Sequence, residues 1–247
     1  MVPISREQLA TLEHWFVPDR PGPLVGLHVI LTGHGGCLVD RWPDPRALLV
    51  ETAANYSLAG DQRALGPADL RGRIAGFVEA PPPFLPLLRA AFPDLLVWDR
   101  VVLVLPAASR PAAGPGRPVR RLGPDDAGGL AALGGESRWV FRTWGGPAGL
   151  AAGGTAWGAF VRDRLVSVAC VFFVGNSYEE IGVATEPGFR RRGLSTACAA
   201  RVCADILSRG RLPSWTTSRD NAASLRVAAK LGFARQRNDY LYVVEGP

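Results

Sequence analysis

The stretch Ile181–Ser195, IGVATEPGFRRRGLS, decides the fold class of this chain. It predicts a β-strand, a short loop, and then three consecutive arginines and a glycine at the start of a helix. The first turn of a helix offers free backbone N–H groups and the positive end of the helix dipole, and both attract anions. A glycine at this point lets the backbone approach a ligand without an intervening Cβ. The stretch therefore predicts a binding site for a pyrophosphate.

The C-terminal half around this stretch predicts an α/β fold with a mixed sheet. Strands are expected at Val119–Leu122, Ala156–Arg162, Leu165–Val174, Tyr178–Thr185, Ser214–Thr217, Phe233–Arg237 and Tyr240–Val244. Helices are expected at Pro124–Leu133, Gly193–Ser208 and Ala222–Leu231. We expect a tight turn at Asp163–Arg164 and a closing hairpin around Asn238–Asp239.

The N-terminal half ends in a similar pattern. LRAAFPDLLVWDRVVLVLP resembles AAKLGFARQRNDYLYVVEG, which indicates a weak internal repeat of helix, strand, turn and strand. A segment rich in Pro, Ala and Gly, residues 106–118, predicts a linker between domains at 1–105 and 119–247. In the first of these we expect one helix, Pro86–Phe92. Its strands are expected at Leu24–Thr32, Gly36–Asp40, Tyr56–Ala59, Ile74–Val78, Leu95–Trp98 and Val101–Leu105, the last two forming a pair.

Composition narrows the class of protein. The 247 residues are 47% hydrophobic and 20% charged, which is typical of a globular chain, and no apolar run is long enough to span a membrane. The N-terminus lacks the pattern of a signal peptide, so we expect a cytoplasmic protein. The net charge of +6 fits an anionic ligand, and we favour a nucleotide cofactor over nucleic acid. The cysteines lack metal-ligand spacing, so we expect no metal site and buried side chains at Cys37, Cys170, Cys198 and Cys203.

Two motifs carry a family resemblance. Arg190–Ser195, RRRGLS, resembles the R/Q-x-x-G-x-G/A signature of the GNAT superfamily of acetyl-CoA-dependent N-acetyltransferases, with Ser195 as the final small residue. Asn221–Ser224 and Lys230–Phe233, which follow it, resemble the N-x-x-S/A and K-L-G-F segments of the same family. The resemblance covers residues 119–247. The sequence VATEPGFRRRGLSTA is similar to the corresponding segment of the zwittermicin-resistance acetyltransferases. This resemblance implies two GNAT-like domains in tandem, of which the first is degenerate.

The resemblance implies a binding site for acetyl-CoA. The strand before the loop would pair its backbone with the pantetheine arm through Val183 and Thr185, and the N–H of Val183 would donate to the thioester oxygen. The helix start would hold the pyrophosphate. An ordinary solvated run of arginines is the alternative. The residues expected to contact the cofactor are Val183, Ala184, Thr185, Arg190, Arg191, Arg192, Gly193, Leu194, Ser195, Thr196, Asn221 and Ser224.

The resemblance also implies catalytic roles. Glu180 occupies the position of a strand glutamate that serves as general base in the family, while its neighbour Glu179 must face the opposite side of the strand. Two solvated acids at a strand edge are the alternative. The tyrosine that often protonates the departing thiolate is replaced by Ala228, so Ser195, Tyr178 or water would supply the proton. No cysteine stands in a nucleophile position, so the acetyl group would pass directly to the acceptor.

The acceptor is expected to be a primary amine of a small molecule. Trp139, Phe141 and Trp144 fall in the variable substrate loop of the family and either line the acceptor pocket or form a hydrophobic lid on the core. Two other functions stay open: a tRNA-dependent aminoacyl-transferase, and a non-catalytic module that binds an acyl-CoA or another ligand. The oligomeric state is open as well.

Overall fold

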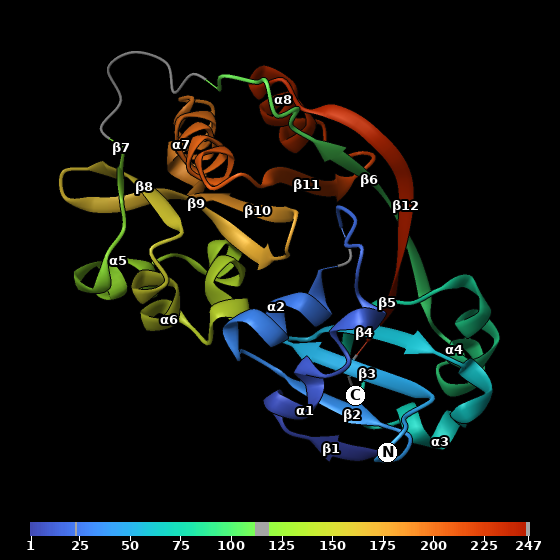
Figure 1. Cartoon of the computed structure of the whole chain (residues 1–247). Coiled ribbons are helices and arrows are strands. Elements are labelled where there is room, and N and C mark those ends of the chain that lie inside the picture. The colour runs from blue at the N-terminus through green and yellow to red at the C-terminus, as the bar shows by residue number, and fades with distance from the viewer. Residues whose placement is uncertain (23, 112–118, 246–247) are drawn as a thin grey trace.

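A single mixed sheet runs through the whole molecule. The computed structural model describes residues 1–22, 24–111 and 119–245, and their strands form one sheet in the order β1-β2-β3-β4-β5-β12-β6-β11-β10-β9-β8-β7 (Figure 1). The strands are β1 Val2–Ile4, β2 Gly36–Val39, β3 Ala47–Thr52, β4 Asn55–Gly60, β5 Gly76–Glu79, β6 Leu96–Val104, β7 Val119–Arg121, β8 Ala156–Val161, β9 Arg164–Val174, β10 Tyr178–Thr185, β11 Leu212–Ser218 and β12 Ala234–Val244. The mixed α/β fold expected from the sequence is confirmed.

Helices cover this sheet. The α-helices are α1 Arg6–Ala10, α2 Val25–Thr32, α3 Pro67–Leu70, α4 Leu85–Ala91, α5 Ala127–Ala131, α6 Pro147–Ala152, α7 Leu194–Ser208 and α8 Ala222–Leu231. Shorter 3₁₀ helices are η1 Glu13–Trp15, η2 Gln62–Ala64, η3 Pro82–Phe84, η4 Pro124–Asp126, η5 Gly135–Trp144 and η6 Pro187–Phe189. Of the expected linker, residues 106–111 contain neither helix nor strand, and residues 112–118 lie outside the described part of the chain.

The C-terminal half follows the expected order of elements closely. Strands β8 and β9 form a hairpin whose turn residues, Arg162 and Asp163, both have positive φ, as a two-residue turn of this kind requires. Helix α8 begins at Asn221, whose side chain accepts the Ser224 N–H at 3.0 Å, and ends at Gly232 with φ 89°. These local signals therefore fix the boundaries of the elements that later form the site.

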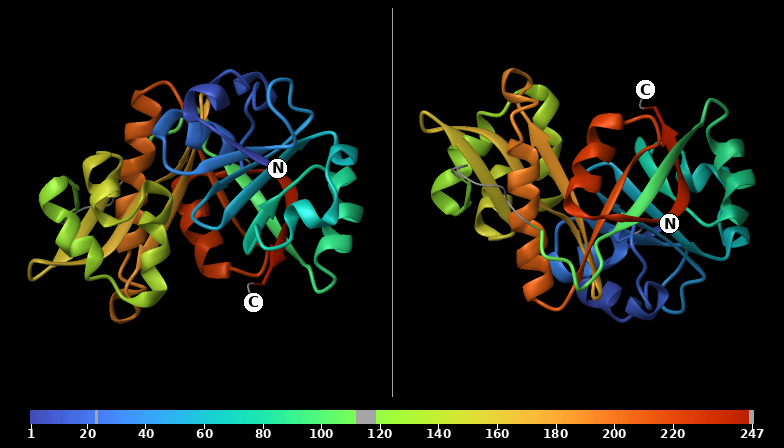
Figure 2. Two further views of the ribbon diagram at one scale, coloured as in Figure 1. Left: turned by 90° about the horizontal axis from the view of Figure 1, so that it is seen from below. Right: turned by 90° about the horizontal axis from the view of Figure 1, so that it is seen from above.

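The two hairpins expected at the ends of the halves are wrong. Residues 96–104 form one strand, β6, and residues 234–244 form one strand, β12, and these long strands pair with each other antiparallel. Strand β6 lies between β11 and β12 of the C-terminal half, and β12 pairs on its other side with β5 of the N-terminal half (Figures 1 and 2). Arg100 and Asp239, at the two expected turns, stand directly opposite each other. Their ion pair lets both strands continue, because each charge has a partner.

The expected strand at Leu24–Thr32 is also wrong, because helix α2 forms there. Residues 25–30 of this helix are buried, so the helix is apolar all round and shows no 3.6-residue periodicity in its sequence. It ends at Gly33, whose φ of 76° is typical of a glycine that terminates a helix.

Buried side chains bind the halves together. His28 of α2 donates from Nε2 to the Thr143 carbonyl at 2.8 Å and accepts the Val174 N–H at Nδ1 at 3.2 Å. Burial lowers the pKa of His28 to about 4, so the ring is neutral near pH 7. One apolar cluster joins α2 to Phe173 of β9, and a larger one lies beneath α7. All four cysteines are buried and free, as expected.

Candidate active site

The sheet opens between β10 and β11. These parallel strands pair only from Tyr178 to Glu180, and β10 then continues to Thr185 without a partner on that side. On its other side β10 pairs with β9, where the Glu186 N–H donates to the Val166 carbonyl. Hydrogen-bonded pairs alternate along an antiparallel ladder, so the main-chain groups of Val183 and Thr185 point away from β9. Apart from the Thr185 carbonyl, which accepts from Arg190, they form a free strand edge facing the opening.

The loop after β10 presents main-chain N–H groups to the same opening. Arg191 and Gly193 have φ of 62° and 74°, which turn the backbone sharply before α7. The first helical hydrogen bond runs from the Ala197 N–H to the Gly193 carbonyl. The three preceding N–H groups, at residues 194–196, therefore have no acceptor within the helix. The helix start with free N–H groups that the sequence predicts is therefore present at this opening.

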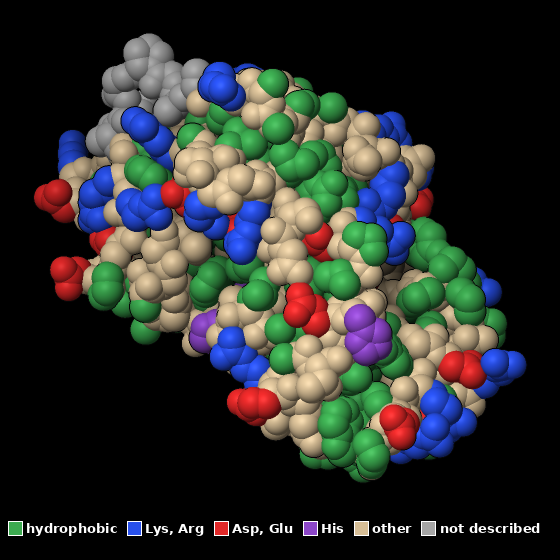
Figure 3. All heavy atoms as spheres, in the orientation of Figure 1, with side chains coloured by type: hydrophobic (Ala, Val, Ile, Leu, Met, Phe, Trp, Pro, Cys, Tyr) green, Lys and Arg blue, Asp and Glu red, His purple; other side chains and the backbone are tan. Residues whose placement is uncertain are grey.

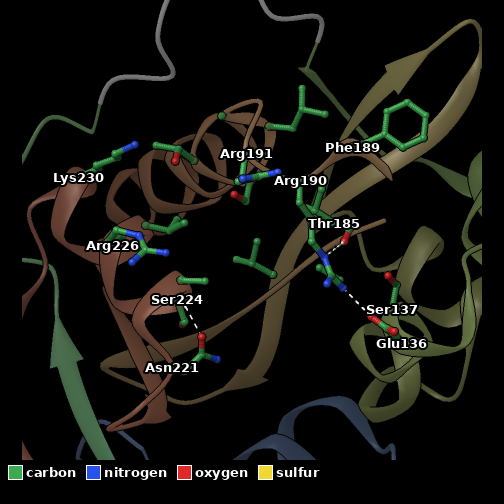
Figure 4. A pocket seen from close by; sticks show the side chains of 18 of the residues that line it. Glu136, Ser137, Thr185, Phe189, Arg190, Arg191, Asn221, Ser224, Arg226 and Lys230 are labelled. Atoms are coloured by element: carbon green, nitrogen blue, oxygen red, sulfur yellow. Dashed lines mark hydrogen bonds and ion pairs between the residues drawn. The ribbon is translucent and has the colours of Figure 1, made fainter. Parts of the chain in front are cut away.

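A pocket of about 770 Å³ joins the free edge of β10, the start of α7, helix α8 and the 3₁₀ helix η5 (Figure 4). The structure brings most of the predicted site residues together here. The lining residues are Glu136, Ser137, Trp139, Val183, Ala184, Thr185, Phe189, Arg190, Arg191, Gly193, Leu194, Ser195, Thr196, Trp215, Asn221, Ala223, Ser224, Arg226, Val227 and Lys230. Of the residues predicted to contact the cofactor, Arg192 does not line this pocket.

The three consecutive arginines have different environments. Arg190 donates to the Glu136 carboxylate at 2.6 Å and to the Thr185 carbonyl at 3.2 Å. Arg192 turns back, donating to the Gly188 carbonyl at 3.0 Å and lying over the Phe189 ring. This internal contact explains why Arg192 is outside the pocket.

Arg191 is the member of the run that stays available to a ligand, since its side chain has no hydrogen-bond or ion-pair partner within residues 1–22, 24–111 and 119–245. The sequence interpretation missed two further cations, Arg226 and Lys230, which α8 presents across the pocket from Arg190 and Arg191 (Figure 4). Their spacing of four residues on an expected helix places both on one face, and this signal could have found them. Figure 3 shows most Lys and Arg side chains of that view over its upper part, where Figure 1 places α7 and α8. The pocket is thus lined by positive charge on two opposite sides.

Glu179 and Glu180 face opposite sides of β10. Glu179 is 1% exposed and accepts from Arg209 at 2.9 Å and also from Arg211. Glu180 is 8% exposed and lies where the pairing with β11 ends, but it does not line the pocket. Burial raises the pKa of Glu180 to about 7, and the charge of Arg100 opposes this rise. A carboxyl with such a pKa can accept a proton near neutral pH.

The three aromatic residues proposed for the acceptor pocket separate into two groups. Trp139 is partly exposed, lines the pocket and packs edge-to-face on Phe172. Phe141 and Trp144 lie in the hydrophobic core, and the Trp144 indole donates to the Val171 carbonyl at 2.7 Å. Phe141 and Trp144 therefore correspond to the alternative of a lid packed on the core.

The structure shows where the missing tyrosine would stand and where the candidate donor Ser195 lies. Ala228, at the position of the missing tyrosine, is a fully buried residue of α8 and carries no proton donor. Ser195 lines the pocket at the start of α7. Trp215 of β11 is buried, lines the pocket and donates to the Ser224 hydroxyl at 2.8 Å.

Comparisons with known proteins agree with this geometry. A sequence model of the GNAT acetyltransferase family matches residues 138–242, which include the whole pocket except Glu136 and Ser137. The chain is 41% identical over 212 residues to an uncharacterized N-acetyltransferase encoded in the mutA 5′ region of Streptomyces virginiae, covering 85% of this chain and 90% of that protein. The chain belongs to the GNAT acetyltransferase family. It is accordingly an acyltransferase. Among the described residues, no helix is long and apolar enough to cross a membrane.

Solved structures of GNAT proteins match the whole chain. A GCN5-related N-acetyltransferase-like protein from Streptococcus suis superposes with a TM-score of 0.71 at 18% identity, covering 96% of this chain and 98% of that one. A tandem GNAT protein of the clavulanic acid biosynthesis pathway superposes with a TM-score of 0.60 at 14% identity, covering 100% and 98%. The fold is therefore that of two GNAT-like domains in tandem.

The residues of the pocket fit the acyl donor of the family. GNAT acetyltransferases use acetyl-CoA, which carries a pyrophosphate, a ribose phosphate and an extended amide-containing arm. The free N–H groups at the start of α7 match the pyrophosphate. The free edge of β10 matches an arm with amide groups, because such an arm can pair with it like a strand. No group of three or more His, Cys, Asp or Glu side chains suited to a metal occurs among the described residues.

Proposed function

We propose that this enzyme transfers the acetyl group of acetyl-CoA to a primary amine of a small molecule by direct attack in a ternary complex. The single observation that supports this most strongly is the joining of a free strand edge and a glycine-containing helix start in one pocket. Acetyl-CoA, when bound, supplies a thioester as the acyl donor. The steps below concern what the residues of the chain do.

The proposed donor site uses main chain first and side chains second. The N–H groups of residues 194–196 would bind the pyrophosphate, and Arg191 would add a charge-assisted hydrogen bond. Arg226 and Lys230 lie on the other side of the pocket, where they would bind the remaining phosphate. Val183 would donate its N–H to the thioester oxygen, because its main-chain groups point into the opening and negative charge grows on that oxygen.

Glu180 is the proposed general base. A primary amine is mostly protonated near neutral pH, so a proton must be removed before the nitrogen can attack. A pKa of about 7 suits this task, since the carboxylate is available and still basic enough to take the proton. Because Glu180 does not line the pocket, the proton would reach it through intervening water. Ser195, which does line the pocket, is the proposed donor to the departing thiolate.

The test of the donor site is the pair Gly193→Val and Gly188→Val. Gly193 has φ 74°, which a β-branched residue strongly disfavours, and its Cβ would stand at the pocket. Gly188 lies in the same loop without positive φ, and a Cβ added there meets no atom within 4 Å. Titration calorimetry with coenzyme A should show at least a tenfold weaker affinity for Gly193→Val and nearly unchanged affinity for Gly188→Val.

Unchanged coenzyme A affinity in Gly193→Val would reject the site. Enzyme assays of the wild-type chain with a panel of amines then test the reaction, and thiol release that depends on the amine is the expected result. Coenzyme A binding without release for any amine would favour the non-catalytic module, and a requirement for aminoacyl-tRNA would favour the aminoacyl-transferase.

We further propose that the chain belongs with the zwittermicin-resistance-like acetyltransferases. The sequence of Val183–Ala197 and the degenerate first half support this subgroup assignment. In this proposal residues 1–105 keep the fold without a pyrophosphate loop, and residues 119–247 hold the donor. Trp139 would contact the acceptor, since it is the partly exposed aromatic side chain of η5 at the pocket.

A further inference from the structure

One face of the sheet carries a buried cluster of charges at the junction of the two halves. Residues directly opposite each other on paired strands share a face, and alternate residues of one strand do so too. Glu180 of β10 stands opposite Ser214 of β11, and the residues two and four further along β11 are Thr216 and Ser218. Ser218 stands opposite Arg100 of β6. Glu180 and Arg100 therefore lie on the same face.

Arg100 is the centre of this cluster. Its side chain is about 9% exposed and forms ion pairs with Glu79 of β5 and, at 2.8 Å, with Asp239 of β12. Two of the three residues, Glu79 and Arg100, come from the N-terminal half. Both lie outside residues 138–242, the part of the chain that the family sequence model matches. The cluster thus places charged groups of the N-terminal half on the same face of the sheet as Glu180.

Polar atoms on this face are left over. Glu79 Oε2 and Ser214 Oγ are buried and have no hydrogen-bond partner among the described residues, and the Thr216 hydroxyl lies beside the Glu180 carboxyl. Burying an unpaired polar group is costly, so these two atoms need partners that the described part of the chain does not supply. They offer acceptors and hydroxyl groups to water molecules that could carry a proton to or from Glu180.

We infer that the N-terminal half completes the reaction centre, with Arg100 and Glu79 as residues whose charges act on Glu180 along one face of the sheet. This inference rests on the proposed function, in which Glu180 removes the proton from the acceptor amine. Arg100 favours the ionised carboxylate, whereas Glu79 and Asp239 favour the protonated one.

No other charged group facing Glu180 changes this balance. Arg237 of β12 pairs with Asp239 at 3.7 Å, and burial lowers the pKa of Arg237. Phe173, the partner of Glu180 on β9, carries no charge. The ion pairs of Glu179 lie on the opposite face of the strand.

The inference predicts shifts of opposite sign. Arg100→Met removes a nearby positive charge and should raise the pKa of Glu180 by about one pH unit. Glu79→Gln removes a nearby negative charge and should lower that pKa by a similar amount. Arg100→Lys keeps the charge and should leave the pKa near its original value. Arg209→Met is the matched control, since Arg209 pairs with Glu179 on the other face and Arg211 still covers that carboxylate.

Two measurements on the full-length chain test these shifts. The first is ¹³C NMR titration of the glutamate carboxyls, with the Glu180 resonance identified by its loss in Glu180→Gln. The second is the pH dependence of kcat/KM, whose acidic limb should move upward in Arg100→Met and downward in Glu79→Gln. Glu79→Gln has nearly the shape of the original and leaves Arg100 paired with Asp239, so it remains informative if Arg100→Met fails to fold.

The outcomes separate the two proposals. Opposite shifts in both measurements support the inference. An unchanged Glu180 titration in both variants, or shifts of the same sign, overturns it. Opposite shifts in the NMR titration with an unmoved kcat/KM profile support the electrostatic coupling and reject Glu180 as the general base.

Discussion

Replacing Glu180 by glutamine should stabilise the protein, and increasingly so as the pH rises. The pKa of Glu180 is raised by burial from 4.5 to about 7. Below pH 4.5 the carboxyl is protonated in both the folded and the unfolded chain, so ionisation contributes nothing. Above pH 7 it is ionised in both states, and the folded state bears the full penalty for a charge in a dry site. At about 1.4 kcal/mol per pH unit, this penalty reaches about 3 kcal/mol.

The assay is urea unfolding of the wild type and of Glu180→Gln at intervals between pH 4.5 and pH 8.5. The difference in the free energy of unfolding should grow by about 3 kcal/mol across this range, most steeply between pH 5 and pH 7. Glu180→Asp keeps a carboxyl at the site, so its difference from the wild type should depend much less on pH. A difference for Glu180→Gln that stays constant with pH would refute the reasoning, whether or not the variant is active.

Three shorter predictions follow from other contacts. His28→Phe leaves two buried main-chain groups without a partner, so the free energy of unfolding in urea should fall by about 2–5 kcal/mol, and a loss below 1 kcal/mol would contradict the role of the ring. Asn221→Ala removes the cap of α8 and should cost about 1 kcal/mol by the same assay. Glu136→Gln releases the exposed Arg190, so calorimetry should show coenzyme A binding that is tighter by up to about fivefold, whereas weaker binding would mean that Glu136 assists the ligand.

The elements around the pocket could be predicted because their signals are local. The capping side chain of Asn221 and the glycine at 193 each act within a few residues, and the structure keeps the corresponding boundaries. The turn expected at Asp163–Arg164 lies one residue earlier, at Arg162 and Asp163. Helix α2 could not be predicted, because a largely buried helix and a buried strand both present a mainly apolar run. The lining of the pocket followed largely from the motif around the arginine run.

The long strands β6 and β12 could not be predicted either. Each has charged residues at its centre, which in a single strand favour a turn, and only the pairing of Arg100 with Asp239, 139 positions apart in the sequence, makes them compatible with a sheet. For the same reason, nothing near Glu180 in the sequence points to Glu79 or Arg100. Contacts between distant segments thus determine the environment of the proposed base, while neighbouring residues determine the donor site.

Strand β6 of the N-terminal half lies between β11 and β12 of the C-terminal half, and this arrangement determines how the protein can be divided into fragments. A C-terminal fragment would have a gap between β11 and β12, and an N-terminal fragment would leave β6 without either of its neighbours. Exposed strand edges of that kind aggregate readily. Two fragments produced together and separated within residues 106–118 should instead associate through these edges, so the protein is suited to fragment complementation, in which recovery of the enzyme reports that the two pieces have met.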